Sequence, residues 1–183
     1  MSPFPFTTAL VTGASSGIGA KMAEQLGRAG VPTVLVARRG EKLREIAGQF
    51  DGFSVLEADL GTAAGQDAVM EAVGNVENPV DLVVNNAGFG TSGQFAEVDA
   101  NRLSDEVELN VKALTRISSA AARAMAARGS GYLLNVSSVA SFQPAPGLAV
   151  YAATKAYVTS LTEALHEELR KTGVHVTALC PGL

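Results

Sequence analysis

Residues 7–19 read TTALVTGASSGIG, and this stretch decides the fold. Its start, Thr7 to Val11, is a short apolar and β-branched run, long enough for one buried strand. Glycines follow at once, and amphipathic spacing then predicts a helix over 18–29. In such a unit, backbone N–H groups and the helix N-terminus can hold a pyrophosphate, which approaches closely because glycines have no Cβ atom. The residues predicted to make these contacts are Gly13, Ser15, Ser16, Gly17, Ile18 and Gly19.

The rest of the chain alternates between the same two patterns. Strand-like apolar runs lie at 7–11, 33–37, 53–57, 82–85, 132–136 and 175–179, and helical patterns at 18–29, 40–49, 65–74, 101–127 and 151–171. Alternating units of this kind form a parallel sheet with helices on both faces, and right-handed crossovers make it a doubly wound, Rossmann-type sheet. A chain of 183 residues can bury one good core, so we predict a single α/β domain over 1–183. Ligand should bind at the carboxyl ends of the strands.

Tyr151 and Lys155 are four residues apart at the start of the last predicted helix. A helix places such residues on one face, where an ammonium group favours the ionised form of a neighbouring phenol. A phenol in this setting can exchange a proton with an alcohol or ketone oxygen, and Ser138 can supply a second hydrogen bond to the same oxygen. The other tyrosines in the chain, Tyr132 and Tyr157, are interpreted as residues that pack in the core.

Two other classes of enzyme match part of the glycine loop. Residues 13–17 fit the G-x-S-x-G pattern of α/β-hydrolases, which also need a later acid and then a histidine on a loop. The only histidines, His166 and His175, fall inside a predicted helix and at the start of a predicted strand. A phosphate-binding loop of the NTPase kind needs Gly-Lys-Ser/Thr, which is absent. Both classes are therefore disfavoured.

Taken together, the motifs resemble the short-chain dehydrogenase/reductase family, in its branch of about 250 residues. The resemblance rests on the spacing Gly-x-x-x-Gly-x-Gly and on Asn85-Asn86-Ala87-Gly88, Asn110, Ser138, Tyr151, Lys155 and Pro181-Gly182, in that order. It implies a nicotinamide cofactor and hydride transfer. It also implies that the family's C-terminal substrate loop, helix and last strand are missing from this chain.

By this resemblance, several residues acquire expected roles. Asn110, Ser138, Tyr151 and Lys155 match the catalytic tetrad, in which the asparagine holds a water for proton supply. Cofactor contacts are implied for Asp59, Asn86, Ala87, Gly88, Pro181 and Gly182, and also for Tyr151 and Lys155. The long helices 101–127 and 151–171 would pair in a homodimer or homotetramer. For Asn110 the alternative is an exposed polar helix position, and for Asp59 it is an N-cap.

The second predicted strand ends at Ala37, where an NAD site would place a carboxylate for the ribose 2′-hydroxyl. Arg38 follows and can pair with a 2′-phosphate. The sequence therefore predicts NADP(H) in preference to NAD(H). The alternative is that Arg38 and Arg39 form a solvated turn.

Composition excludes several partners. The net charge is −4 and no basic run is present, so nucleic acid is not expected. Cys180 is the only cysteine, which fits a reducing compartment and a cytoplasmic protein. The N-terminus does not resemble a signal peptide, no stretch is predicted to span a membrane, and no metal site is predicted.

The segment 141–150 (SFQPAPGLAV) is expected to line the substrate pocket. Its apolar residues Phe142, Pro144, Pro146 and Leu148 favour an apolar ketone or alcohol as the small-molecule substrate. The second functional hypothesis is a non-catalytic sensor that binds NADP(H). Proteins of that kind usually lose the tyrosine or the lysine, whereas this chain retains both.

Overall fold

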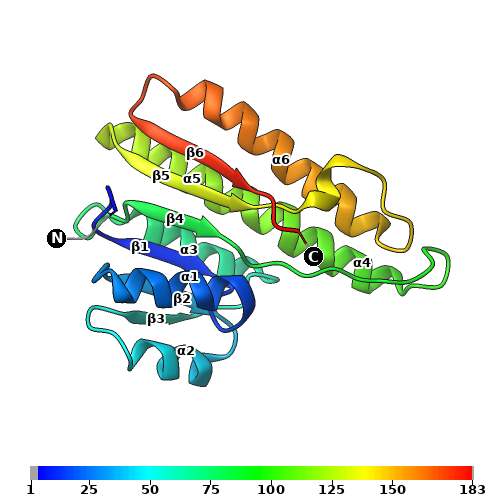
Figure 1. The fold of residues 1–183 in the computed structure, drawn as a ribbon, viewed down its shortest axis with the longest axis horizontal. Helices are drawn as coiled ribbons and strands as arrows, with labels where there is room; N and C mark the ends of the chain where they lie inside the picture. The colour runs from blue at the N-terminus through cyan, green and yellow to red at the C-terminus, as the bar shows by residue number, and fades with distance from the viewer. Residues whose placement is uncertain (1–3, 183) are drawn as a thin grey trace.

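The computed structural model describes residues 4–182 (Figure 1). Within this range, six strands form one parallel sheet in the order β3-β2-β1-β4-β5-β6. The strands are β1 (Ala9–Thr12), β2 (Thr33–Ala37), β3 (Ser54–Glu57), β4 (Leu82–Asn85), β5 (Gly131–Val136) and β6 (Val174–Leu179). The direction of winding reverses between β1 and β4, where open α/β sheets bind their ligands. The predicted doubly wound parallel sheet is confirmed, and its strand ends differ from the predicted ranges by two residues or fewer.

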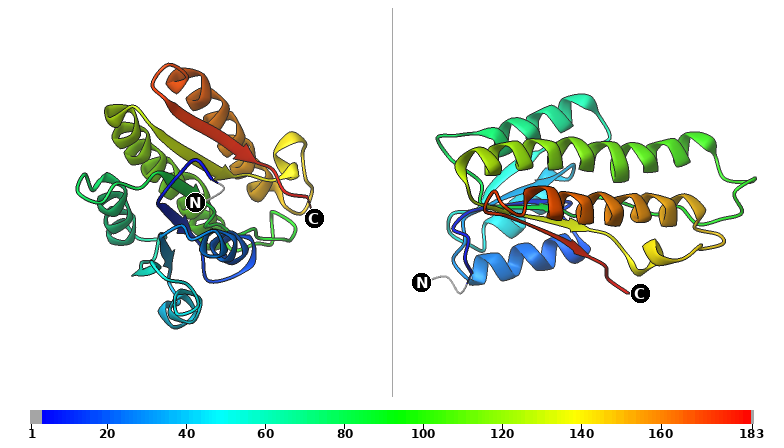
Figure 2. Two further views of the ribbon diagram at one scale, coloured as in Figure 1. Left: turned by 60° about the vertical axis from the view of Figure 1, so that its left-hand side comes forward. Right: turned by 90° about the horizontal axis from the view of Figure 1, so that it is seen from above.

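Helices cover both faces of this sheet, as predicted. They are α1 (Gly17–Arg28), α2 (Gly40–Ala47), α3 (Ala63–Gly74), α4 (Ala100–Val107), α5 (Leu114–Arg128) and α6 (Ala149–Leu169). Figure 2 shows α1 on one side of the sheet and α3 and α5 on the other.

Successive side chains of β1 enter two different cores, because a strand alternates between the faces of its sheet. Leu10 packs in a cluster that includes Val69 of α3 and Ile117 of α5. Val11 packs in the opposite cluster with Ala23 of α1 and Leu43 of α2. All four of these partners are buried. Burial on both faces explains why the strands read as continuous apolar runs rather than as alternating ones.

The predicted helix over 101–127 differs from the structure in its middle. A π-helical turn, η1 (Glu108–Ala113), joins α4 to α5, so the helical stretch is continuous but locally widened. Such turns accommodate one extra residue and occur often at functional sites. Asn110 lies in this turn. The turn was not predictable from spacing, because one extra residue barely disturbs the apolar period.

The two tyrosines interpreted as core residues have different surroundings. Tyr132 stacks on His175 and meets the edge of Phe6, and it packs against the core beneath α1. Tyr157 is 39% exposed, and its hydroxyl lies 2.9 Å from Thr115 Oγ1 on the surface. The prediction for Tyr157 is therefore wrong, because α6 turns that side chain away from the sheet.

Among the described residues, no helix has the length and apolar character needed to cross a membrane.

Candidate active site

A cavity of about 730 Å³ lies at the carboxyl ends of the strands. It is lined by every predicted site residue except Gly19 and Asn110. Residues that were not predicted also line it, chiefly Arg39, Phe89, Gly90, Val139 and Ala140. The topology brings these positions together because parallel strands all end at the same edge of the sheet.

The glycine loop forms one end of this cavity. Gly13 and Gly17 have φ angles of +66° and +58°, which favour glycine. A Cβ atom on Gly13 would lie 2.8 Å from Asn86 Nδ2, whereas one on Gly17 would meet open space. Gly19 packs against Gly13 and Asn86 instead of facing the cavity. The loop therefore uses its glycines partly for close packing between α1 and β4.

Ser16 precedes α1 but makes no side-chain hydrogen bond to the first turn of this helix. The first N–H groups of α1 thus have no side-chain cap and can bind an anion, with the helix dipole in favour. Ser15, Ser16, Gly17 and Ile18 all line the cavity at this point. The donor set fits the pyrophosphate of a dinucleotide.

Thr12 fastens the loop to the end of β4 and was not identified from the sequence. Its Oγ1 accepts hydrogen bonds from the backbone N–H groups of Asn86 and Ala87, each at 3.0 Å. In return, Asn86 Nδ2 donates to the carbonyl oxygen of Thr12 at 2.9 Å. Asn86 and Ala87 therefore line the cavity from a position that Thr12 fixes. A threonine directly before the first glycine was the only available signal.

Two consecutive arginines follow β2, and the structure distinguishes between them. Both line the cavity, but Arg39 Nη2 donates to Ser15 Oγ and to Ser16 Oγ, each at 2.9 Å. Arg38 has no such contact with these serines among the described residues. The alternative of a purely solvated turn is wrong for Arg39. The sequence could not choose between adjacent arginines, because their directions depend on the turn after Ala37.

Asp59 lies beyond the end of β3 and lines the cavity. Its Oδ1 accepts a hydrogen bond from the backbone N–H of Gly61 at 2.9 Å. The N-cap of α3 is Thr62, whose Oγ1 accepts from the backbone N–H of Gly65 at 3.1 Å. The alternative interpretation of Asp59 as the N-cap is therefore wrong.

Tyr151 and Lys155 lie in the first turns of α6, with Lys155 Nζ 5.7 Å from the centre of the Tyr151 ring. Lys155 is only 5% exposed, and its Nζ donates to the carbonyl oxygen of Val136 at 2.7 Å. Ser138, which follows β5, is also buried and lines the same cavity. Its Oγ accepts from the backbone N–H of Ala140 at 3.1 Å, which leaves the hydroxyl proton free to donate.

Burial lowers the pKa of Lys155 from 10.5 to about 8, because the ammonium group is removed from water. Electrostatic interactions with Cys180 and Glu106 raise this pKa, but by less than burial lowers it. Near neutral pH the lysine thus remains protonated while its pKa lies within reach of ordinary pH changes.

Asn110 is 1% exposed and does not line the cavity. Its Nδ2 donates to the carbonyl oxygen of Phe89 at 2.7 Å and to Thr154 Oγ1 at 3.1 Å. Its Oδ1 accepts from the backbone N–H of Phe89 at 3.1 Å. The alternative of an exposed polar helix position is wrong. Asn110 stands behind the cavity wall, between η1, α6 and the segment after β4.

The segment 141–150 lines the cavity with fewer apolar side chains than predicted. Of the four apolar residues that were expected to do so, only Leu148 lines the cavity. Phe142 is 67% exposed and lies outside it, as do Pro144 and Pro146. The short 3-10 turn at 139–142 turns the Phe142 ring toward solvent. Val139, Ala140 and Ala145 keep this wall largely apolar, and Gln143 is its polar member.

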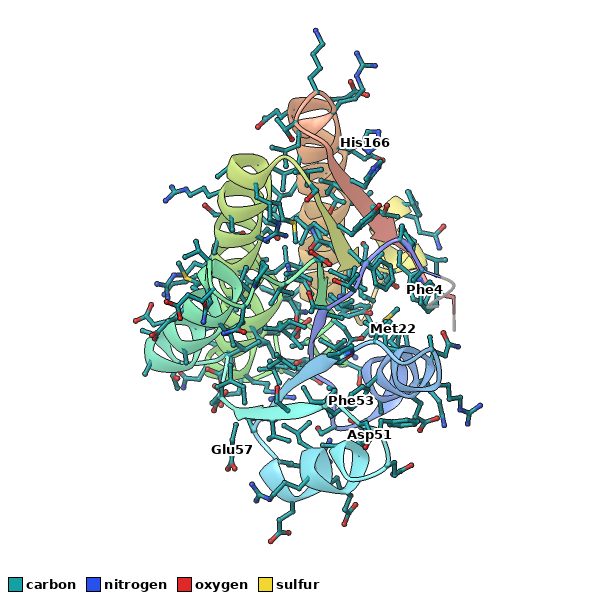
Figure 3. The ribbon with its side chains drawn as sticks, turned by 90° about the vertical axis from the view of Figure 1, so that its left-hand side faces the viewer. Phe4, Met22, Asp51, Phe53, Glu57 and His166 are labelled. Atoms are coloured by element: carbon teal, nitrogen blue, oxygen red, sulfur yellow. The ribbon has the colours of Figure 1, made fainter. Side chains whose placement is uncertain are left out.

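The histidines do not form a hydrolase site. His166 lies on α6, and its Nδ1 is 3.0 Å from the carbonyl oxygen of Val176 on β6. Figure 3 shows His166 beside β6, away from α1 and the glycine loop. His175 is on β6 itself, stacked on Tyr132. Neither histidine lines the cavity.

Comparison with known proteins gives consistent results. The sequence profile of the family described as short chain dehydrogenase matches residues 7–183. An uncharacterized oxidoreductase of Staphylococcus epidermidis is 36% identical over 176 residues, which are 96% of this chain and 76% of the relative. The crystal structure of a bulky-bulky ketone specific alcohol dehydrogenase from Comamonas testosteroni has a TM-score of 0.92 and 36% identity, over 98% of this chain and 74% of that one.

A short-chain dehydrogenase from Sphingobium yanoikuyae, solved in complex with NADPH, has a TM-score of 0.91 and 37% identity. The match covers 96% of this chain and 70% of that one. With a family profile that matches nearly the whole sequence, a solved structure at a TM-score of 0.92, and relatives above 30% identity over most of their length, the chain belongs to the short-chain dehydrogenase family of oxidoreductases.

Proposed function

We propose that the chain is an NADP(H)-dependent oxidoreductase that interconverts a ketone or aldehyde and an alcohol, with Tyr151 as the general acid and base. The observation that carries the proposal is the position of Tyr151, Ser138 and Lys155, which line the same cavity as the glycine loop. The dinucleotide-binding end and the proton-donating end thus belong to one continuous space. We further propose that residues 1–183 act as one domain.

The chemistry of each side chain follows from its contacts. When bound, the nicotinamide supplies or accepts the hydride. In the reductive direction, negative charge develops on the substrate oxygen, and Tyr151 donates its phenolic proton there. Ser138 donates a second hydrogen bond to the same oxygen. The ammonium group of Lys155, held by Val136, stabilises the phenolate that remains on Tyr151.

This role requires Lys155 to carry its proton. Because the pKa of Lys155 is about 8, the rate of ketone reduction should fall as the pH rises through this value. Asn110 does not contact the cavity. It supports the cavity wall indirectly, because its side chain holds the backbone of Phe89 in place.

NADP(H) is favoured over NAD(H) by the groups at the end of β2. Ala37 offers no carboxylate to the ribose 2′-hydroxyl. Arg39, Ser15 and Ser16 gather a guanidinium and two hydroxyl groups at one point of the cavity, and Arg38 adds a second positive charge. Such a cluster suits a 2′-phosphate. The NADPH complex of the Sphingobium yanoikuyae relative supports the same choice.

The wall beside Tyr151 supports an apolar carbonyl substrate. Val139, Ala140, Ala145 and Leu148 contribute aliphatic surface, and Phe89 contributes an aromatic ring. The ketone specificity named for the Comamonas testosteroni structure agrees with this chemical class.

A single free cysteine, Cys180, fits action in the reducing cytoplasm.

A homodimer or homotetramer is proposed from the apolar surface beside α4 and α6. Phe95 and Val107 are 66% and 43% exposed, and they border a groove with Val111, Ala149 and Ala153. Large exposed apolar side chains of this kind often mark interfaces. Light scattering of the purified protein would give the oligomeric state.

The proposed function is tested by titrating the purified protein with NADPH and with NADH, following nucleotide fluorescence, and then by assaying apolar ketones. We expect tighter binding of NADPH and turnover of at least one ketone. Tight NADPH binding without turnover of any carbonyl compound would instead support a sensor. Failure to bind either nucleotide would contradict both.

A further inference from the structure

One face of the helical stretch α4–η1 carries three side chains at four-residue spacing, and all three contact the short segment 88–91 that follows β4. The Arg102 guanidinium carbon lies 3.8 Å from the centre of the Phe89 ring. Glu106 Oε2 accepts a hydrogen bond from the backbone N–H of Thr91 at 3.0 Å. Asn110 satisfies both backbone groups of Phe89. Residues spaced by four share a helix face, so the face acts as one surface against the segment.

The segment 88–91 lies directly on the proposed reactive groups. A Cβ atom added to Gly90 would lie 2.9 Å from the Tyr151 ring. One added to Gly88 would lie 2.8 Å from Asn110 Oδ1 and 3.7 Å from Lys155 Nζ. At Gly88 and Gly90 the segment therefore has no room for a side chain between the α4–η1 face and Tyr151. A shift of its backbone would move the wall against which Tyr151 is positioned.

Glu106 is the unexpected member of this face, because it is a carboxylate with no exposed surface. Its Oε1 and the neighbouring Thr91 Oγ1 are buried without a hydrogen-bond partner among the described residues. No described cation lies within ion-pair distance of it. Burying a carboxyl group is costly unless it is hydrogen-bonded, so the buried side chain of Glu106 depends on its contact with the Thr91 N–H.

The electrostatics of Lys155 agree with these contacts, although the contacts stand independently of them. Burial lowers the pKa of Lys155 to about 8, and the Glu106 carboxylate partly offsets this effect by raising that pKa.

We propose that Glu106 is a positioning residue of the hydride-transfer site, which with Asn110 clamps the segment 88–91 against Tyr151. This inference rests on the proposed function for its effect on turnover. The clamp itself can be measured without turnover.

The test compares Glu106→Leu, which removes both the acceptor and the charge, with Glu106→Gln, which removes only the charge. Asp105→Asn is the matched control, since it removes one negative charge from an exposed position of the same helix. For each variant we would measure NADPH affinity, kcat and KM with a ketone that the unmodified protein reduces, the pH profile, and amide hydrogen exchange at Thr91 and Phe89.

In Glu106→Leu we expect faster exchange at Thr91 and a loss in kcat of about 100-fold, the order that follows a displacement of about 1 Å at a reacting group. NADPH affinity should stay within about twofold, since Glu106 is remote from the glycine loop. Glu106→Gln should keep the protection of Thr91, because the amide oxygen still accepts a hydrogen bond from the Thr91 N–H. Asp105→Asn should behave as the unmodified protein.

The proposal is overturned if Glu106→Leu leaves exchange at Thr91 and kcat unchanged, or if Asp105→Asn loses as much activity. Loss of the protection of Thr91 in Glu106→Gln, which retains an acceptor, would also overturn it, even if Glu106→Leu failed to fold. If the unmodified protein binds NADPH but reduces no ketone, the proposed function fails. The exchange rates at Thr91 and Phe89 then still decide whether the clamp exists.

Discussion

The two halves of the sheet are held by different kinds of contact. In the half formed by β1, β2 and their helices, the buried side chains are mainly aliphatic, such as Leu10, Leu35 and Leu43. In the half formed by β4, β5, α5 and α6, polar side chains bond to one another inside the protein. Asn85 and Asn135 are register partners on adjacent strands, and Asn85 Nδ2 donates to Asn135 Oδ1 at 3.0 Å.

The polar contacts continue from the sheet into α6. Asn135 Nδ2 donates to Thr162 Oγ1 at 3.0 Å, and Ser137 Oγ donates to the carbonyl oxygen of Lys155 at 2.9 Å. Aliphatic packing fills volume but sets orientation weakly, whereas a buried hydrogen bond specifies both partners and direction. The half with β4, β5, α5 and α6 must orient the side chains of Tyr151 and Lys155, and it is held by buried hydrogen bonds. The half with β1 and β2 offers mainly the backbone of the glycine loop to the cavity, and apolar packing is sufficient to hold it.

The largest expected effect concerns the reactive group of the polar half. Tyr151→Phe removes one hydroxyl group and should lower kcat about a thousandfold, within the range of general acid–base catalysis. Nucleotide affinity should stay within about twofold, because the glycine loop is untouched. Steady-state kinetics and NADPH titration would check both values. Comparable turnover in the variant would remove Tyr151 from the mechanism.

A substitution in the apolar half should change the stability of the protein rather than its activity. Leu35 has no exposed surface, so Leu35→Ala should lower the free energy of unfolding by about 3 kcal/mol through lost burial and a residual cavity. Below its melting temperature, the variant should keep near-normal kcat. Urea denaturation and kinetics on the same sample would measure the two quantities.

Asn135→Leu is the counterpart in the polar half. It keeps a similar volume but removes the acceptor for Asn85 Nδ2 and the donor to Thr162 Oγ1 inside the protein, which should cost about 1–3 kcal/mol of stability. Unlike Leu35→Ala, it should also lower kcat at temperatures where the protein is folded, because α6 loses a tie to the sheet. The comparison between the halves fails if both variants change stability alone.

Arg39→Ala probes the nucleotide end of the cavity. Charge-assisted hydrogen bonds contribute about 1.5–3 kcal/mol, so NADPH affinity should fall about 10- to 100-fold while NADH affinity stays unchanged. Arg38→Ala provides the comparison, since among the described residues it is Arg39, and not Arg38, that donates hydrogen bonds to Ser15 and Ser16. Equal losses for NADPH and NADH would show that Arg39 supports the loop rather than the 2′-phosphate.

The smallest expected effect on stability is a gain. Lys155→Met should stabilise the fold by about 1–2 kcal/mol at neutral pH, because a buried ammonium group is replaced by an apolar chain of similar length. The gain is limited by the lost hydrogen bond to Val136.

The pH dependence of this gain has a definite sign. The folded state binds its proton on Lys155 more weakly than the unfolded state, with a pKa of about 8 against 10.5. The free energy of unfolding of the unmodified protein should therefore rise with pH between these two values. The stability advantage of Lys155→Met should be full below about pH 8 and vanish above about pH 10.5. Thermal denaturation of both proteins across this range would measure it. An advantage that is independent of pH would contradict the burial of a charged lysine.

Much of the fold could be predicted because each signal is local. The apolar runs placed every strand within two residues, and glycines with helical spacing placed α1. Features that depend on one extra backbone residue or on one face of a helix could not be predicted in the same way. The π turn at η1 and the exposed side of Tyr157 are the clearest cases.

The residues of the candidate site likewise fall into those that a local sequence motif marks and those that it does not. Residues in motifs, such as Gly13, Ser138 and Tyr151, were identified because the spacing marks them. Glu106 was missed, since a glutamate within a charged helix resembles a surface residue until the segment 88–91 is known to cover it. Arg39 was missed because an adjacent arginine carries the same signal.

By itself, the sequence determined the fold class, the family and the edge of the sheet at which the site lies, because parallel strand–helix units bring all their carboxyl ends to one place. Only the tertiary structure decided which side chains meet there: Arg39 with the loop serines, Asn110 with Phe89, and Glu106 with Thr91. The physical reason is that hydrogen bonds act over about 3 Å. Whether residues far apart in the chain come within that range depends on how the helices pack on the sheet.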